Sequence, residues 1–161
     1  MDKSDASSRE ILVFELEDQR YGIPLDDVIE TVRAVAITPL PQAPPIVEGI
    51  LNFRGRVVPV LDVRARFRQR PKAMDIHDHL ILARTGARQV ALRVDRAAGL
   101  VRVPGKDLED AEKIIPGLGY VTGVARLPDG LVLIHDLGTF LSGPEDRALS
   151  ESLSAHEKAR A

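Results

Sequence analysis

Cysteine and tryptophan are both absent from this sequence of 161 residues. Without cysteine the chain has no disulfide framework and no thiolate nucleophile, which fits a reducing compartment and predicts a cytosolic location. No apolar run approaches the ~20 residues that a membrane-spanning helix needs, so we expect membrane contact only through a partner. These absences exclude a disulfide-stapled secreted domain and a cysteine-dependent enzyme.

Charge of one sign is also lacking, because 22 basic and 24 acidic side chains nearly cancel to a formal net charge of −2. Aromatic residues are few, with two tyrosines and four phenylalanines. A nucleic-acid-binding small β-barrel, the alternative from a different class, needs a cationic surface and aromatic side chains on which bases stack. The composition therefore argues against a nucleic-acid partner.

Short β-branched runs separated by turn residues are what the sequence does contain, and they predict a mainly β protein. Residues 1–9 are polar and predict a flexible arm. After residue 143, a proline and two acidic residues open a pattern with Leu149 and Leu153 four apart, which predicts a helical tail. The ten predicted strands are 11–15, 21–25, 29–34, 50–53, 57–61, 80–84, 89–94, 99–103, 120–125 and 131–135.

An internal repeat relates the two halves of the chain. The segment 49–51, Gly-Ile-Leu, recurs as Gly-Val-Ala at 123–125, and at the same offset 58–63 recurs as 132–137. Each copy predicts two strands joined by a tight turn and followed by an aspartate that can cap a short helix. The repeat indicates two linked units of similar fold.

Polar residues interrupt the first of these hairpins at its turn, where the sequence reads Asn52-Phe53-Arg54-Gly55. One interpretation is turn chemistry alone, since asparagine and glycine tolerate positive φ and Arg54 would point into water. The other is a binding site carried by the hairpin. Spacing alone does not separate the two.

The hairpin resembles the Asn-Leu-Arg-Gly hairpin of CheW proteins, with the preceding glycine and the following Val-x-Pro-x-x-Asp at the family's spacing. Phe53 departs from the usual aliphatic residue, which leaves fine partner specificity open. The resemblance follows the family in order from Ile11 to Leu141. It continues in the segments 13–16, 21–25, 28–33, 94–95 and 120–123.

The resemblance implies a fold of two intertwined five-stranded SH3-like β-barrels that form one CheW-like domain over residues 10–143. The expected division lies at approximately 20–85 and 86–143, with the first strand crossing over. Short helices and a C-terminal helical tail over 144–161 complete the expected architecture.

The resemblance also implies a non-enzymatic chemotaxis adaptor that couples methyl-accepting chemoreceptors to a CheA-type histidine kinase in cytoplasmic receptor arrays. The receptor's cytoplasmic tip, a helical hairpin, is expected in an apolar groove between the barrels, and the kinase regulatory domain at barrel edges. No cofactor is expected. An adaptor of a pilus or other non-flagellar pathway is an open alternative. The expected partner-binding residues, some of which would serve equally well as core, are Val28, Glu30, Val32, Asn52, Arg54, Gly55, Leu80 and Leu100.

Two chemical alternatives can be weighed against this prediction. His77 and His79, next to Asp75 and Asp78, are residue types that ligate zinc or nickel, but a fourth ligand is not apparent and a hydrated loop explains them better. Aspartates 62, 95 and 136 end apolar strands, where a carboxylate could act as a base, although helix capping explains two of them. Neither pattern predicts an enzyme.

Overall fold

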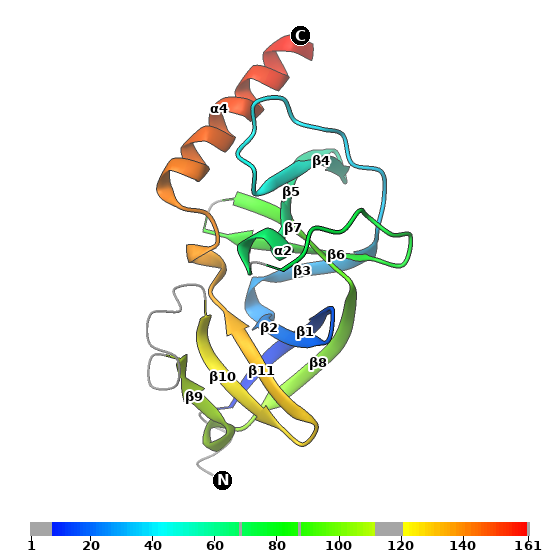
Figure 1. The fold of residues 1–161 in the computed structure, drawn as a ribbon. Helices are drawn as coiled ribbons and strands as arrows, with labels where there is room; N and C mark the ends of the chain where they lie inside the picture. Colours follow the sequence, from blue (N-terminus) through cyan, green and yellow to red (C-terminus); the bar gives the residue numbers. More distant parts are fainter. Residues whose placement is uncertain (1–7, 68, 87, 112–120, 161) are drawn as a thin grey trace.

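Two β-sheets, joined by crossing segments of the chain, make up most of the computed structural model (Figure 1). The structure describes residues 8–67, 69–86, 88–111 and 121–160. The mainly β class predicted from the sequence is confirmed. Most of the expected N-terminal arm and Tyr120, the first residue of one predicted strand, lie outside the described residues.

The first sheet has five strands in the order β3-β6-β7-β5-β4. Its strands are β3 (Val28–Arg33), β4 (Val47–Phe53), β5 (Arg56–Asp62), β6 (His79–Thr85) and β7 (Arg88–Val94). The second sheet has six strands in the order β8-β1-β2-β11-β10-β9. Its strands are β1 (Arg9–Leu16), β2 (Gln19–Pro24), β8 (Arg96–Val103), β9 (Leu108–Asp110), β10 (Val121–Leu127) and β11 (Gly130–His135).

Of the helices that the structure describes, all but the last are short. The short helices η1 (Leu25–Asp27), α2 (Val63–Arg66) and η2 (Gly105–Asp107) connect strands, and η3 (Leu137–Thr139) connects β11 to the C-terminal helix α4 (Gly143–Arg160). In Figure 1 α4 runs beside the five-stranded sheet to the C-terminus. All ten predicted strands and the tail helix are present, whereas β9 was not foreseen.

The division between the two sheets differs from the expected one near residue 85. The five-stranded sheet runs from 28 to 94, and both β1 and β2 join the strands of the C-terminal half. β1 pairs with β8 on one side and β2 pairs in parallel with β11 on the other. The sheet needs both strands, because together they fill the space between β8 and β11. Two strands therefore cross over rather than one.

The predicted repeat is visible in the strand register. Gly49 on β4 lies opposite Val60, and Gly123 on β10 lies opposite Ile134, at equivalent places in the two copies. Both pairs follow a register shift. Gly49 is required there, because a Cβ atom would lie 2.5 Å from the carbonyl oxygen of Thr38. The copies thus share a distorted hairpin as well as a sequence pattern.

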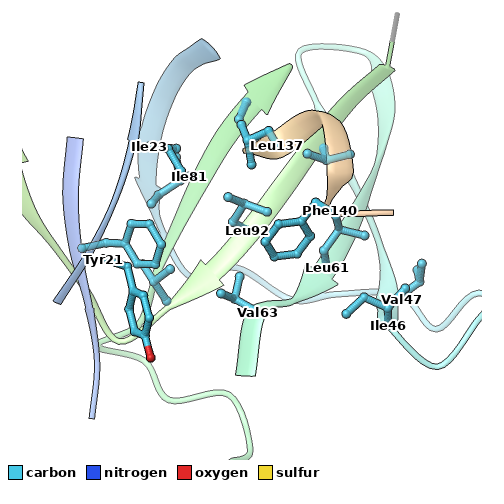
Figure 2. Packing of buried hydrophobic residues seen from close by; sticks show 14 of the residues in the cluster. Tyr21, Ile23, Ile46, Val47, Leu61, Val63, Ile81, Leu92, Leu137 and Phe140 are labelled. Atoms are coloured by element: carbon cyan, nitrogen blue, oxygen red, sulfur yellow. The ribbon is translucent and has the colours of Figure 1, made fainter. Parts of the chain in front are cut away.

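The largest buried cluster lies between the two sheets, in a region that we call the seam (Figure 2). It combines side chains of β1 and β2 with side chains of the five-stranded sheet, and Phe140, directly after η3, and Leu149 of α4 add to it. Two smaller buried clusters are each formed by side chains from the strands of one sheet. The two sheets therefore share one core and pack as one unit.

Candidate partner-binding site

The β4–β5 turn gives the predicted hairpin a defined geometry. Phe53 lies opposite Arg56 and closes the two-residue turn Arg54-Gly55. Both turn residues have positive φ, 52° and 83°, as in the type I′ turn whose twist suits a hairpin. The Gly55 N–H donates to Asn52 Oδ1 at 2.9 Å. A non-glycine residue adopts such a φ only occasionally, so the turn holds Arg54 in a strained conformation and marks a candidate functional position.

Arg54 is presented on the surface, with 70% of its side chain exposed. Its Nη2 donates to Glu30 Oε2 on β3 at 2.6 Å, and its guanidinium carbon lies 4.8 Å from the centroid of the Phe53 ring, a cation–π distance. Because β3 and β4 are the two ends of the strand order, this ion pair connects both edges of the sheet. We call Glu30, Asn52, Phe53, Arg54 and Gly55 the hairpin site.

Val32 on β3 supports the hairpin site through apolar packing. Together with Phe53 it packs against the buried cluster inside the five-stranded sheet. Phe53 was not among the predicted site residues, although an aromatic residue directly before the turn arginine was a signal for it. The structure therefore brings together five of the eight predicted residues: Glu30, Val32, Asn52, Arg54 and Gly55.

The expected apolar groove between the sheets is filled at its centre by the chain's own side chains. Phe14 and Tyr21 stack with ring centroids 5.8 Å apart, and Phe140 is 1% exposed in the same seam cluster. This corrects the expectation of an open groove along the seam. Among the described residues, the exposed apolar side chains next to this cluster lie at its border.

Two predicted residues lie on that border. Val28 is half-buried and packs against the seam cluster. Leu100 lies opposite Leu12 of that cluster but on the edge strand β8, where 61% of it is exposed. Ile29, beside Val28 on β3, is 37% exposed and was not predicted. We call Val28, Ile29 and Leu100 the seam border.

Leu80 is placed elsewhere. It is completely buried and belongs to the cluster inside the five-stranded sheet. β6 lies between β3 and β7 and is buried on both faces from Leu80 to Ala83. The expectation that Leu80 lines a groove is therefore not met, because side chains of the protein itself cover both faces of β6 at this position.

A buried arginine ties the two sheets together. Arg64 on α2 is 1% exposed; its Nη1 donates to Glu17 Oε1 at 2.7 Å and its Nη2 to Asp95. Burial raises the pKa of Asp95, but the hydrogen bonds from Arg64 and from the Glu17 N–H outweigh it and leave that pKa below its usual value. Arg64 begins a basic stretch that runs to Lys72, yet it is buried whereas Arg70 of the same stretch is exposed.

The two chemical alternatives find structural explanations. Asp62 Oδ1 accepts from the Ala65 N–H and Asp136 Oδ1 from the Gly138 N–H, so both aspartates cap the turns that follow. His79 Nδ1 accepts from the Ala97 N–H, and Asp78 accepts from buried Arg93. Within the described residues no group of three His, Cys, Asp or Glu side chains is placed to hold a metal ion.

An exposed charged hairpin, a seam border and carboxylates engaged in structural contacts define a binding module. Residues 10–145 match the family model described as CheW-like domain. The chain is 26% identical over 147 residues to the chemotaxis protein CheW of Treponema pallidum (strain Nichols), which covers 88% of this chain and 86% of that protein. The crystal structure of the scaffolding protein TtCheW from Thermoanaerobacter tengcongensis superposes with a TM-score of 0.78 at 27% identity, covering 85% of this chain and 94% of that one.

A third match is to a much longer protein. The chemotaxis protein CheA of Bacillus subtilis (strain 168) is 26% identical over 125 residues, which are 77% of this chain and 18% of that protein.

The chain belongs to the CheW-like domain family. It is a chemotaxis-type adaptor, a scaffold rather than an enzyme. In the described part of the chain, no helix combines the length and the apolar character needed to cross a membrane.

Proposed function

We propose that this adaptor holds a chemoreceptor tip at the seam border and the regulatory domain of a CheA-type histidine kinase at the hairpin site. The proposal is carried by the hairpin site, in which a strained turn fixes an exposed arginine against a glutamate of β3, at the opposite end of the strand order. A rigid charged group loses little freedom on binding, which favours its use in recognition. Membrane contact is proposed to occur only through the receptors, at their cytoplasmic tips.

The seam border suits the receptor because its residues are apolar and continuous with the core. A helical hairpin that covers Leu100 and Ile29 would remove two exposed apolar side chains from water, and the two strands that carry them belong to different sheets. The receptor would then contact both halves of the adaptor at once. Such a contact can transmit a small shift between the sheets.

Leu100→Glu is expected to weaken binding of a receptor signalling fragment at least about tenfold, because burying a leucine contributes about 1.5–3 kcal/mol and a tenfold change is about 1.4 kcal/mol. Isothermal titration calorimetry with the soluble fragment measures it. Leu131→Glu is the matched control, since Leu131 on β11 is 56% exposed and lies outside the seam border. Equal weakening by both variants would contradict the receptor site.

The hairpin site is tested by exchanging its charges. Arg54→Glu is expected to weaken binding of the kinase regulatory domain about tenfold or more, because it reverses a charge that faces the partner. Adding Glu30→Arg restores an ion pair within the adaptor but leaves both charges reversed toward the kinase. We therefore expect the double variant to stay weak.

The measurement is the dissociation constant of the kinase regulatory domain, with Arg84→Glu as a control at an exposed arginine on β6. Recovery of affinity in the double variant would show that the pair only stabilises the adaptor. Absence of any binding by the wild-type chain would overturn the kinase proposal itself.

A further inference from the structure

The C-terminal helix is a part of this chain that the family match scarcely reaches, because the match ends at residue 145 and α4 extends to Arg160. The helix is nevertheless built firmly onto the fold. Ser142 Oγ accepts from the Glu145 N–H, and Glu145 Oε1 accepts from the Ser142 N–H, which is a capping box. Leu149 is fully buried in the seam cluster, and Ser152 Oγ donates to the Gln42 carbonyl at 2.9 Å.

A hollow of about 430 Å³ lies between this helix and the strands of the five-stranded sheet. Its walls come from β5, from the facing ends of β6 and β7, and from α4. The charged and apolar residues that line it are Arg56, Val57, Pro59, Arg88, Asp146 and Leu153.

The side chains that line the hollow carry one more positive charge than negative charge. Arg88 Nε donates to Asp146 Oδ1 at 3.0 Å and its Nη2 donates to Ser150 Oγ at 2.5 Å, so this arginine and the aspartate neutralise each other. Arg56 is exposed and forms no ion pair with any residue that the structure describes. The hollow therefore presents a guanidinium group that is available to an external anion.

Apolar surface lies beside this cation. Val57 is 36% exposed, Leu153 on α4 is half-buried, and Pro59 lies at the base. A guanidinium group next to aliphatic side chains fits a carboxylate that is itself next to an aliphatic side chain. Free phosphate or a nucleic acid would use the cation but leave the apolar wall uncovered.

The hollow is continuous with the hairpin site, since Arg56 and Val57 follow Arg54 and Gly55 directly and Asn52 lies opposite Val57 on the same exposed face. We propose that the hollow between β5 and α4 is a second docking point for the kinase, and that it takes an acidic residue flanked by an aliphatic one on the kinase surface. This inference rests on the proposed kinase contact at the hairpin site and extends it across the turn onto the tail helix.

Arg56→Glu tests the inference with the regulatory domain of the cognate CheA-type kinase as the probe. The variant is expected to bind at least fivefold more weakly than the wild type, and its affinity should depend less steeply on salt, because one attractive charge pair is lost. Arg147→Glu is the matched control: Arg147 is an exposed arginine of α4 outside the hollow, and the change in net charge is the same. Its affinity should stay within twofold of the wild type.

A second variant tests the part played by the helix. Leu153→Glu places a carboxylate in the hollow and should compete with the kinase for Arg56, whereas Ser154→Glu places it at an exposed position next along the helix. Thermal unfolding of all four variants verifies that each is folded at the temperature of the titration.

The outcomes separate this inference from the proposed function. If Arg54→Glu weakens kinase binding while Arg56→Glu binds as Arg147→Glu does, the hollow is no docking point and the hairpin site stands. If the wild-type chain binds no kinase, both fall together. Weakening by Arg56→Glu and Leu153→Glu, with both controls unchanged, supports the second docking point.

Discussion

Replacing Arg64 with methionine is expected to lower the free energy of unfolding by about 3 kcal/mol, because removing one partner of a buried ion pair leaves the other charge uncompensated. Arg64 is 1% exposed and serves two carboxylates, of which Asp95 is 20% exposed. Urea unfolding at pH 7 measures the change. Arg70→Met, at an exposed position on the same basic stretch, should change it by less than about 0.5 kcal/mol.

Acid should reduce the difference between wild type and Arg64→Met. The pKa of Asp95 is lowered in the folded protein, so its contribution to stability is complete above the unfolded carboxyl pKa of about 3.9 and is lost as pH falls through the folded value. The two unfolding curves should therefore converge below about pH 4. A difference that stays constant with pH would show that Arg64 acts through packing instead of charge.

Phe140→Ala is expected to lower the free energy of unfolding by about 4 kcal/mol, within the range for truncating a buried aromatic residue. Phe140 is 1% exposed and meets Phe67 edge to face at 6.0 Å between ring centroids. Its loss opens a cavity in the seam, where both sheets contribute side chains (Figure 2). The partly exposed Val35→Ala serves as control. A loss below about 1 kcal/mol would mean that the sheets move together and refill the seam.

Local patterns were sufficient to predict the strands and the duplication. The β-branched runs, the turn residues and the recurring glycine act over a few residues, and the register around Gly49 and Gly123 confirms the repeat. β9 was not predicted because it has only three residues, Leu108-Glu109-Asp110, and none of them has a β-branched side chain.

Contacts between residues far apart in the sequence could not be predicted from such local patterns. The partners of Arg64 lie 47 and 31 positions away, so nothing near it in sequence distinguishes it from the exposed Arg70. For the same reason the crossing of β2 was not foreseen along with that of β1, since it depends on the pairing of β2 with β11.

The turn of the hairpin site was predictable because Asn52 to Gly55 are adjacent in sequence, and its geometry is present in the structure, whereas its binding role stays a prediction. Glu30 was expected at the site, but its ion pair with Arg54 spans the sheet and required the structure. Leu80 and Leu100 look alike in sequence, and only the strand order separates a central strand from an edge.

The crossing of β1 and β2 has a consequence for translation. β1 is synthesised well before its partner β8, because about half of the chain lies between the two strands. Until β8 and β11 are synthesised, the hairpin of β1 and β2 has no neighbouring strands to pair with. An isolated two-stranded hairpin is only marginally stable in water. The six-stranded sheet cannot form from the C-terminal half alone, because its central strands β1 and β2 come from the N-terminal end of the chain. The duplicated gene therefore encodes a single cooperative unit, and a premature stop before residue 96 would leave a product prone to aggregate.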